Sequence, residues 1–436
     1  MTRKNNVFAA GLFFAGLVFA LSFTVSCGGK TEKQKVVLTV QAEQGWMPYY
    51  KEAVKRVEET HPNTEIKLIE VGAFDHLDRL DATDASNKDV ADLFAIPADR
   101  LYGLAENEVL ASIDSKKISS ELGGWSNFDL GLGGNLKIGN EYLAFPLNIE
   151  TLITFVNTAN ASAQGADYTK PFELANQKDP ATVLLPLFDA WYGVAPANSA
   201  AIEFLGKKNG TELFSDMVME FKDLPAEKRA AIETIYNYWK LNYENKTPLF
   251  DADAGWGYID KEFSNGNKGI IRLGGPWDTG SILEQTKGNL VIYPISHITL
   301  NGKPILHWKG GWGLAINSRI EKDAEKYALA EAMIKEIVNP KYAVDFFKAT
   351  GKILENVPAE TYAASNLSDT EKAVIRAVIE SYKISPARPL FKEWGKVWDT
   401  WRNAILSWNS VNPKNAEEAY KELKASFDAM MANFKM

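Results

Sequence analysis

The sequence predicts an α/β protein with more than one domain, in which doubly wound, mostly parallel sheets are flanked by helices. The first observation is that three β-branched strands, at residues 36–40, 64–71 and 90–96, are separated by helical patterns. Strands that alternate with helices in this way are typical of a doubly wound sheet. The second observation is the length of 436 residues, which is too great for one hydrophobic core. We therefore expect two domains.

The N-terminus predicts export. Arg3 and Lys4 precede an apolar segment at residues 7–23, which is too short for a comfortable membrane span and ends in small and polar residues. A basic start followed by a short apolar run is typical of a signal peptide. We interpret residues 1–26 as that signal peptide.

The end of this leader predicts lipidation. The letters Val-Ser-Cys-Gly resemble a bacterial lipoprotein cleavage site, with Cys27 as the lipidated first residue of the mature chain, although Thr24 stands where a Leu is typical. The alternative is a free Cys in an uncleaved leader. Residues 27–35 are small and polar in their first part and suit a flexible tether. Cys27 is the sole Cys in the sequence, which excludes disulfides and a Cys nucleophile.

The charge and the aromatic content narrow the class of ligand. The net charge is −8, and no block of Lys and Arg interrupts the acidic chain, which argues against nucleic acid and against an electrostatic membrane surface as partners. The chain holds 12 Trp, 16 Tyr and 22 Phe. Most of these belong in a core, but aromatics beyond the needs of a core line pockets, and sugars stack on them.

The first half of the chain continues the pattern of strands and helices. Apolar residues spaced three or four apart predict a helix over residues 47–60, which His61-Pro62-Asn63 ends. Residues 142–157 form a long β-rich run that contains Pro146. We interpret this run as a strand that Pro146 interrupts and that resumes where the chain crosses from one lobe to another.

The second half is mostly helical in pattern. We expect helices over residues 183–192 and 226–243, and a strand over residues 289–298 that runs through Pro294. Further expected elements, which complete the chain, are a strand at 308–317 and helices at 324–338, 342–347, 369–383, 393–408 and from 417 onwards.

One turn stands out as a candidate binding element. At residues 268–282 a short apolar strand ends in Gly-Gly-Pro-Trp, and a helical pattern follows. This order places Trp277 at the carboxyl end of a strand, where open α/β sheets bind ligands. The alternative is a packed loop with a half-buried Trp.

Four segments, in this order, carry a resemblance to a known family: residues 91–113, 139–157, 262–277 and 302–317. They resemble the extracellular solute-binding proteins of ABC sugar importers, most closely the maltose/maltodextrin-binding branch. The resemblance implies a two-lobed periplasmic-binding-protein fold of type II, with the ligand in the cleft between the lobes and enclosed by hinge closure. It implies an N-terminal lobe of residues 36–147 plus 298–346 and a C-terminal lobe of residues 148–297 plus 347–436.

The resemblance also implies a set of ligand-binding positions. By their place in the family pattern these are Glu43, Gln44, Asp75, His76, Asp78, Asp99, Arg100, Glu150, Trp277 and Trp398. Gln44 and His76 stand where the branch has Lys, and Ile96 stands where it has a stacking Trp. These departures leave the identity of the sugar open.

The residue types suit carbohydrate, because a sugar presents fans of hydroxyls beside an apolar ring face. For Asp99 the alternative is a helix cap with Arg100 exposed, and for Glu150 it is a solvated strand residue.

Three further aromatics are candidates from their positions alone. Trp191 and Tyr192 face either the cleft or a core, and Trp394 with Trp398, four residues apart, forms either part of the site or one buried stripe.

Other chemistries remain as alternatives. Carboxylates beside aromatics also describe a glycoside hydrolase, for which Asp251, Asp253 and Glu43 are candidates. Asp75, His76 and Asp78 offer a crowded set of metal ligands. The glycines at residues 131–134 faintly resemble a phosphate loop, but no Lys-Ser/Thr follows them.

We therefore expect a monomeric carbohydrate-binding lipoprotein of an ABC importer, exported to the periplasm or the outer cell surface and held to the membrane by its lipid anchor. It would capture a maltose- or maltodextrin-like oligosaccharide and deliver it to permease subunits in the inner membrane. We expect no catalysis, no cofactor and no metal. The alternatives are another sugar or solute, or a sensory surface lipoprotein.

Overall fold

The computed structural model describes residues 35–124, 128–209 and 211–434. Val36–Met436 forms one compact unit. The expected signal peptide, Cys27 and nearly all of the expected tether lie outside the described residues. Among the helices of the described ranges, none is both long enough and apolar enough to cross a membrane.

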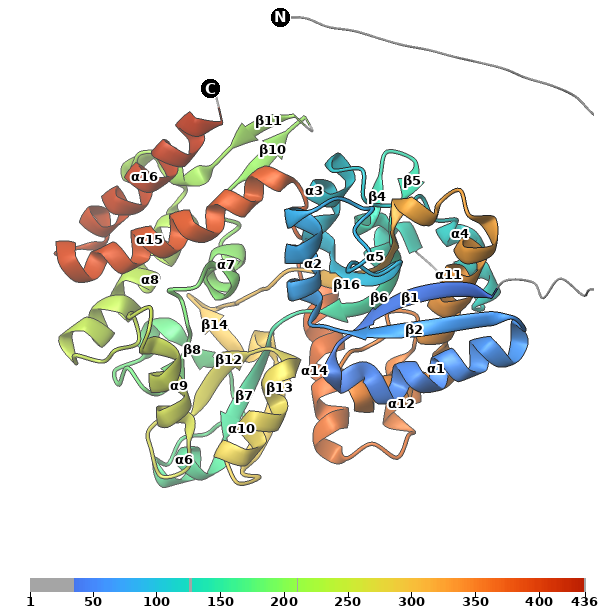
Figure 1. The fold of residues 1–436 in the computed structure, drawn as a ribbon. Coiled ribbons are helices and arrows are strands. Elements are labelled where there is room, and N and C mark those ends of the chain that lie inside the picture. Colours follow the sequence, from blue (N-terminus) through green and yellow to red (C-terminus); the bar gives the residue numbers. More distant parts are fainter. Residues whose placement is uncertain (1–34, 125–127, 210, 435–436) are drawn as a thin grey trace, which may run out of the picture. The chain divides into compact units, whose positions relative to one another are not determined.

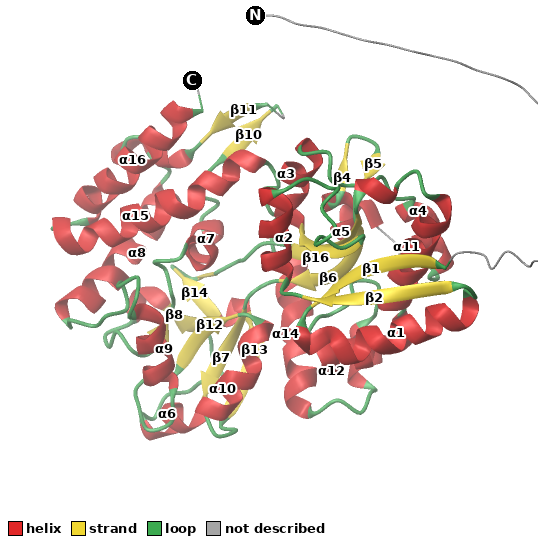
Figure 2. Ribbon diagram, in the orientation of Figure 1, coloured by secondary structure: helices red, strands yellow, loops and turns green. Residues whose placement is uncertain are grey.

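The first sheet confirms the predicted alternation of strands and helices (Figures 1 and 2). Its strands, in spatial order, are β2 (Thr64–Glu70), β1 (Val36–Ala42), β3 (Leu93–Pro97), β16 (Gly310–Ile316) and β6 (Phe145–Glu150). β1 pairs in parallel with β2 and β3, whereas β16 runs antiparallel to β3 and β6. Within the described residues, this sheet therefore has one reversed strand.

The helix α1 (Met47–Thr60) covers this sheet for a reason that its sequence shows. Tyr50, Ala53 and Val57 are buried and recur every three or four residues, so one face of the helix is apolar. Pro48 lies in its first turn, where the missing N–H has no intrahelical partner to lose. α1 packs against β2 and against α11 (Ala324–Ile337).

A buried carboxylate ties the start of β3 to two other elements. Asp92 is 1% exposed and accepts a hydrogen bond from Thr39 N at 2.9 Å. It also forms an ion pair with Arg319 Nη2 at 2.7 Å. Lys326 Nζ of α11 lies 3.0 Å away. Burial by itself would raise the pKa of Asp92, but the hydrogen bond from Thr39 and the charge of Arg319 outweigh it and lower the pKa. The carboxylate therefore stays ionised and paired.

The second sheet has the same plan. Its strands, in spatial order, are β13 (Leu290–Pro294), β7 (Ile153–Asn157), β12 (Ile271–Gly274) and β9 (Val183–Leu184). β7 runs antiparallel to both β12 and β13, and β9 runs parallel to β12. As in the first sheet, one described strand is reversed, which agrees with the prediction of mostly parallel sheets.

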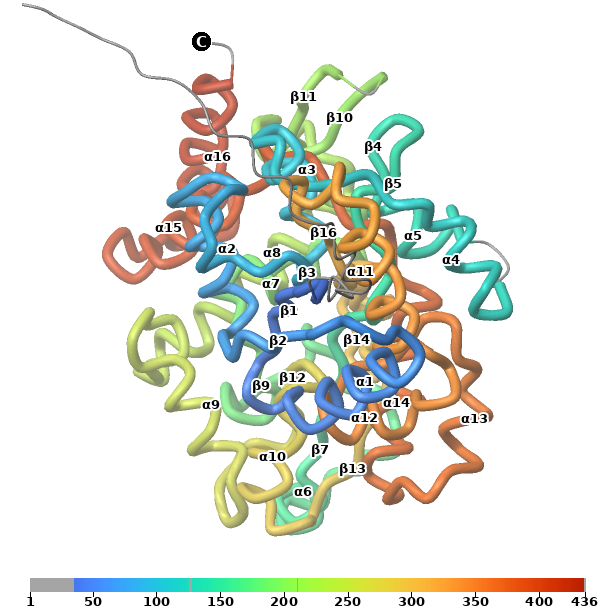
Figure 3. Tube along the Cα trace, turned by 45° about the vertical axis from the view of Figure 1, so that its right-hand side comes forward, coloured from blue at the N-terminus to red at the C-terminus, as the bar shows by residue number. Residues whose placement is uncertain are grey.

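Smaller sheets and helices complete the fold. The minor strands are β4 (Lys137–Ile138), β5 (Glu141–Tyr142), β8 (Phe172–Glu173), β10 (Gly206–Lys208), β11 (Glu212–Phe214), β14 (Ile298–Leu300) and β15 (Lys303–Pro304). The other helices are α2 (Ala73–Ala82), α3 (Leu101–Glu106), α4 (Ser115–Glu121), α5 (Leu132–Asn135), α6 (Thr158–Ala163), α7 (Ala190–Ser199), α8 (Ala226–Glu244), α9 (Gly255–Phe263), α10 (Thr279–Gln285), α12 (Ala343–Thr350), α13 (Ala359–Ala363), α14 (Asp369–Ile384), α15 (Gly395–Val411) and α16 (Ala416–Asn433). Figure 3 shows α15 and α16 running side by side, and the two pack against each other.

The two sheets are joined by a short connection. β6 ends at Glu150 and β7 begins at Ile153, so the chain passes from one sheet to the other within two residues. An isolated bridge joins Ile149 of β6 to Ile353, and α14 packs against β6, β7 and β13. Three segments far apart in the sequence therefore meet at this connection.

The predicted interruption at Pro146 is wrong in its position. Pro146 lies inside β6, and the strand breaks instead at Thr151 and Leu152. β6 is an edge strand, and its register with β16 shifts between Trp312 and Gly313, close to the Pro. Edges and bulges are the places in a sheet that tolerate a residue without an N–H.

Two further boundary predictions are wrong. The expected helix over residues 183–192 is a strand, β9, followed by α7, whose first turn is capped by Asp189. A short apolar run has no periodicity that separates strand from helix, and pairing with β12 decided this one. The expected strand over residues 289–298 ends at Pro294, where the 3-10 helix η8 (Ile295–His297) begins.

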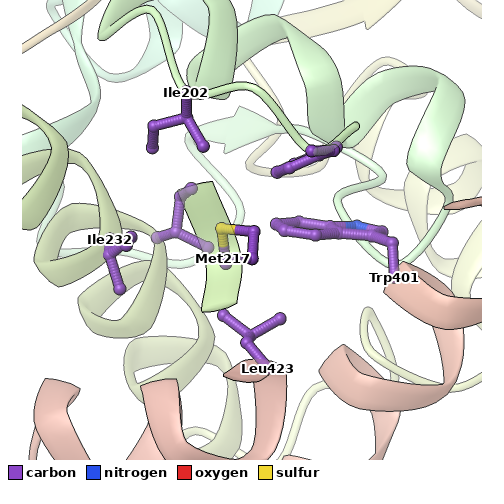
Figure 4. Close-up of a pocket in the computed structure, with 7 residues that line it drawn as sticks. Ile202, Met217, Ile232, Trp401 and Leu423 are labelled. Carbon is purple, nitrogen blue, oxygen red and sulfur yellow. The ribbon is translucent and has the colours of Figure 1, made fainter. Parts of the chain in front are cut away.

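The helical core beside the second sheet is closely packed (Figure 4). One gap in this core has no room for a water molecule and is lined by Ile202, Phe204, Met217, Ile232, Ile235, Trp401 and Leu423. Trp401 is held there by stacking on Phe204, with the ring centres 4.5 Å apart, and by donating to Leu187 O at 2.8 Å. This gap is a feature of packing and not a site.

A glycine of α7 tests this packing. A Cβ on Gly193 would lie 2.5 Å from Nε1 of Trp401, and Trp401 has no free direction in which to move. We expect Gly193→Ala to lower the free energy of unfolding by about 1–3 kcal/mol, measured by urea denaturation.

Gly257→Ala is the matched control, since Gly257 also lies inside a helix but a Cβ there would meet no atom of the described residues within 4 Å. We expect it to be neutral or to raise stability by about 0.5–1 kcal/mol. Equal effects of the two substitutions would contradict the packing argument.

Candidate ligand-binding cleft

A cleft of about 940 Å³ lies at the carboxyl ends of strands from both sheets. Its walls come from α2, the end of β3, the end of β6, β16, α7, the turn after β12 and the segment before α15. The lining residues are Phe74, Asp81, Pro97, Asp99, Arg100, Gly103, Leu104, Asn107, Glu150, Trp191, Trp277, Trp312, Lys352, Arg388, Pro389, Phe391, Lys392, Trp394, Gly395 and Trp398. A volume of this size is in the range of small-molecule sites.

The structure brings together part of the predicted site. The predicted residues that line the cleft are Asp99, Arg100, Glu150, Trp191, Trp277, Trp394 and Trp398. The predicted residues that are described but lie outside the lining are Glu43, Gln44, Asp75, His76, Asp78 and Tyr192.

Trp277 stands where the sequence placed it, between a strand and a helix. β12 ends at Gly274, the 3-10 helix η7 (Pro276–Asp278) follows, and α10 begins directly after it. The Asp278 carboxylate accepts a hydrogen bond from Gly275 N at 3.0 Å, which fixes the turn. A Cβ on Gly275 would overlap the indole of Trp277. The glycine therefore lets the indole lie against the backbone, while half of the side chain stays exposed toward the cleft.

Asp99 is held by an arginine from a distant part of the chain. Asp99 lies in the 3-10 helix η2 (Ala98–Arg100), and its Oδ2 accepts from Arg388 Nη2 at 2.6 Å. Its side chain caps no helix, so the alternative interpretation of Asp99 as a cap is wrong. Its second oxygen, Oδ1, is buried and accepts no hydrogen bond from any described residue. The adjacent Arg100 pairs with Asp81 of α2.

Aromatic rings form the opposite part of the cleft wall. Trp394 ends the 3-10 helix η11 (Lys392–Trp394), and Trp398 follows one turn later with its ring centre 4.7 Å away. Trp191 of α7 lies 6.3 Å from Trp398, and the Arg388 guanidinium lies 4.9 Å from the Trp191 ring. Trp394 is 5% exposed and lines the cleft together with Trp398, so the geometry is compatible with both interpretations of this pair.

A tryptophan of β16 joins a carboxylate and a lysine. Trp312 Nε1 donates to Glu150 Oε2 at 2.7 Å, so Glu150 is a held group and not a solvated strand residue. The Lys352 ammonium lies 4.6 Å from the centre of the Trp312 ring and 5.2 Å from that of Trp46. Burial lowers the pKa of Lys352, and the charges of Glu150 and Glu43 oppose that effect.

The glycines around Trp312 explain how these groups approach each other. A Cβ on Gly311 would lie 2.6 Å from Asn148 O, and a Cβ on Gly313 would lie 2.7 Å from the side chain of Leu136. Real Cβ atoms almost never approach this closely, so a side chain at either position would force its neighbours to shift. The glycines on both sides of Trp312 therefore let β16 pack closely against those neighbours.

His76 lies in the core. It is fully buried on the inner face of α2, where it packs against Phe94 and its Nε2 accepts from Ala91 N at 2.9 Å. Burial, and to a lesser extent the charges of Arg79 and Arg319, lowers its pKa to about 4, so the ring is neutral at pH 7. The prediction of His76 as a ligand contact is wrong for this structure because the helix turns position 76 inward.

Of the other predicted residues outside the lining, two make contacts within the fold and three are exposed on the surface. Glu43 accepts from Ala73 N, the first residue of α2, at 3.3 Å. Gln44, Asp75 and Asp78 are exposed. Tyr192 is 6% exposed and packs edge-on against Trp256; burial raises the pKa of its hydroxyl.

Several residues that line the cleft were not among the predicted site residues. They are Phe74, Asp81, Trp312, Lys352, Arg388, Phe391 and Lys392. Helical spacing could have found two of them, because Phe74 and Asp81 are seven residues apart and share one face of α2. Lys352 and Arg388 lie in connections without periodicity, so no sequence pattern pointed to them.

The alternative chemistries find no support in this geometry. Within the described ranges, no group of three or more His, Cys, Asp or Glu is placed to hold a metal ion. Asp251 caps its own turn by accepting from Asp253 N and Ala254 N and does not line the cleft. The glycines at residues 131–134 allow close packing, since a Cβ on Gly133 or Gly134 would overlap Phe128 or Asp129.

Comparison with known proteins agrees with the fold and the resemblance. The family model described as bacterial extracellular solute-binding protein matches residues 42–344. The maltodextrin-binding protein MdxE of Bacillus subtilis (strain 168) is 25% identical over 372 residues, which cover 84% of this chain and 83% of that protein. A maltooligosaccharide ABC transporter solute-binding lipoprotein of Streptococcus pneumoniae is 24% identical over 410 residues, with 88% of each chain covered.

A solved structure extends the likeness to three dimensions. The maltose-binding periplasmic protein MalE of Listeria monocytogenes, in complex with maltose, superimposes with a TM-score of 0.68 at 19% identity, covering 91% of this chain and 98% of that one. This likeness shows the two-lobed type II periplasmic-binding fold that the resemblance implied.

The buried His76 gives a testable dependence of stability on pH. Its folded pKa of about 4 is below the value of 6.5 for an unperturbed His, so the unfolded chain binds the proton first as the pH falls. The stability tied to His76 is complete above pH 6.5 and is lost progressively toward pH 4, by about 3 kcal/mol in total.

His76→Gln keeps a carbonyl acceptor for Ala91 N but does not titrate in this range. We expect the free energy of unfolding of this variant, measured in urea, to fall less steeply between pH 6.5 and 4.5 than that of the unaltered protein. Identical slopes would show that His76 does not contribute to acid unfolding.

Proposed function

The chain belongs to the family of bacterial extracellular solute-binding proteins, and we propose that it captures an oligosaccharide in the cleft for an ABC importer. The observation that carries the proposal is the joint placement of aromatic rings and held charged groups in one cleft. Trp277 presents a half-exposed indole there, and Trp191 and Trp398 line it from other elements. Asp99 and Glu150 add carboxylates that hydrogen bonds hold in place.

This combination matches the two surfaces of a sugar ring. The apolar C–H face stacks on an indole, and the hydroxyls at the ring edge bond to groups that are already oriented. Orientation in advance matters because each side chain that a ligand must immobilise lowers the net affinity.

We propose that the ligand is a maltose- or maltodextrin-like α-glucan. Support comes from the Bacillus and Streptococcus relatives, which are a maltodextrin-binding protein and a maltooligosaccharide ABC transporter solute-binding lipoprotein. Gln44, His76 and Ile96 still differ from the residues of the maltodextrin-binding branch at these positions, and Ile96 is fully buried in β3. A different oligosaccharide, or another solute, is the alternative.

We further propose that the cleft closes by a hinge between the predicted lobes. The proposed crossings are at residues 145–150, 294–297 and 347–353, and the bridge between Ile149 and Ile353 brings the first and third together. Short connections of this kind let one lobe rotate as a body against the other.

We propose that the protein performs no catalysis. Each carboxylate of the lining faces a fixed donor: Asp81 has Arg100, Asp99 has Arg388, and Glu150 has the indole of Trp312. A glycosidase needs two carboxyl groups that are free to act on the scissile bond, whereas each carboxylate here is already engaged by a donor of the protein.

Export and anchoring complete the proposal. We propose that residues 1–26 direct export, that Cys27 carries the lipid, and that the monomeric protein delivers its sugar to permease subunits in the inner membrane. The name of the Streptococcus relative, an ABC transporter lipoprotein, supports this arrangement. A sensory lipoprotein with the same cleft would lack the contact with a permease.

Calorimetric titration tests the proposed function. The chain from residue 28 onwards would be titrated with maltose, maltotriose, trehalose, cellobiose, a xylo-oligosaccharide and, as a control, a polyamine. We expect micromolar or tighter binding to one of the α-glucans. Silence from every sugar, with the protein shown to be folded, would contradict the proposal.

Trp277 provides a residue-level prediction. We expect Trp277→Ala to weaken binding of the preferred sugar by about 1–3 kcal/mol through loss of stacking, measured by the same titration. Tyr243→Ala is the control, since Tyr243 is also a partly exposed aromatic but does not line the cleft. Unchanged affinity in a folded Trp277→Ala variant would remove Trp277 from the site.

A further inference from the structure

We propose that Lys352 is a direct ligand-binding residue, and that it acts with Glu150 to recognise two neighbouring hydroxyl groups of one sugar ring. This inference rests on the proposed function. It assigns a donor at a position that sequence patterns did not single out.

Lys352 differs from the other cations that line the cleft. Arg100 pairs with Asp81, Arg388 with Asp99, and Lys392 with Glu106. Among the described residues, no carboxylate lies within ion-pair distance of the Lys352 ammonium. Lys352 is partly buried and lines the cleft, so its ammonium retains hydrogen-bonding capacity that the protein does not use.

The ammonium is nevertheless held in place. The rings of Trp312 and Trp46 lie 4.6 and 5.2 Å from it, so two aromatic faces fix a side chain that is usually mobile. A Lys held by rings, and not by a carboxylate, keeps its N–H groups free for a ligand.

Trp312 also fixes the partner of Lys352. The indole N–H bonds to Oε2 of Glu150 at 2.7 Å, while the indole face contacts Lys352. One side chain therefore sets the spacing between a donor, the ammonium, and an acceptor, the Glu150 carboxylate.

The chemistry of this pair favours a neutral polyhydroxyl ligand. A hydroxyl both donates and accepts, so one hydroxyl donates to Glu150 while its neighbour accepts from Lys352. The two charges balance, and the site as a whole has no excess of positive charge to attract an anion. An acidic sugar would place its carboxylate near Glu150 and meet repulsion.

The test compares Lys352→Met with Lys348→Met in the chain from residue 28 onwards. Methionine keeps a flexible, unbranched apolar side chain but has no N–H to donate. Lys348 is exposed, lies four residues earlier in α12, and does not line the cleft. With the preferred neutral oligosaccharide we expect Lys352→Met to weaken binding about 10- to 100-fold and Lys348→Met to leave the affinity unchanged.

Monodeoxy versions of the sugar identify the contact. Removing the hydroxyl that accepts from Lys352 should weaken binding to the unaltered protein and make little further difference to Lys352→Met. If Lys352→Met proves unstable, Lys352→Arg serves as the second variant. Because arginine keeps N–H donors, we expect Lys352→Arg to bind the sugar with part of the original affinity.

The outcomes separate this inference from the proposed function. If the unaltered protein binds no sugar, the proposed function fails first. If it binds sugar and Lys352→Met binds equally well, Lys352 is not a ligand contact. Tighter binding of a uronic-acid oligosaccharide than of its neutral counterpart would overturn the assignment of a hydroxyl pair in favour of an anion site.

Discussion

The hydrogen bond from the indole of Trp312 to the carboxylate of Glu150 is the interaction on which the cleft depends. It joins β16, the reversed strand of the first sheet, to the last residue of β6, directly before the chain leaves for the second sheet. Glycines on both sides of Trp312 let the neighbouring strand and helix approach. Loss of the indole would free the Glu150 carboxylate and remove one of the two rings that hold Lys352.

The position of the cleft follows from the topology of the sheets. In both sheets the described strands run mainly in one direction, so their carboxyl ends gather at one edge where side chains from several elements meet. β6 and β7 are consecutive, and the edges of the two sheets are therefore brought near each other by a connection of two residues. Residues as far apart as Asp99 and Arg388 form an ion pair across this region.

The sequence predicted the architecture well, because periodicity and strand order are local signals. The helix at residues 47–60 agrees with α1 at both ends, and the strand, turn and helix around Trp277 are as expected. Prediction failed where a tertiary contact decided the outcome. β9 became a strand by pairing with β12, and the break near Pro146 moved to the point where the chain changes sheet.

The site was harder to predict than the fold for two physical reasons. Family position assigned His76 to the ligand, but the buried spacing of Ala73, His76 and Leu80 places it on the inner face of α2. Attention to helical phase would have favoured Phe74 and Asp81 instead. Lys352 and Arg388, by contrast, lie in connections, and only the folded chain brings them beside Glu150 and Asp99.

Fixed polar groups beside aromatic rings explain why such a cleft suits a sugar. Arg388 orients the carboxylate of Asp99, and the indole of Trp312 orients that of Glu150. A ligand hydroxyl that bonds to a group already oriented does not have to immobilise it, so less binding free energy is lost in ordering the site. The sugar also brings an apolar face that the indoles can cover in the same step. The cleft thus holds charged groups that are fixed by partners on one side and open on the other, which is an arrangement for binding a neutral, hydroxyl-rich molecule.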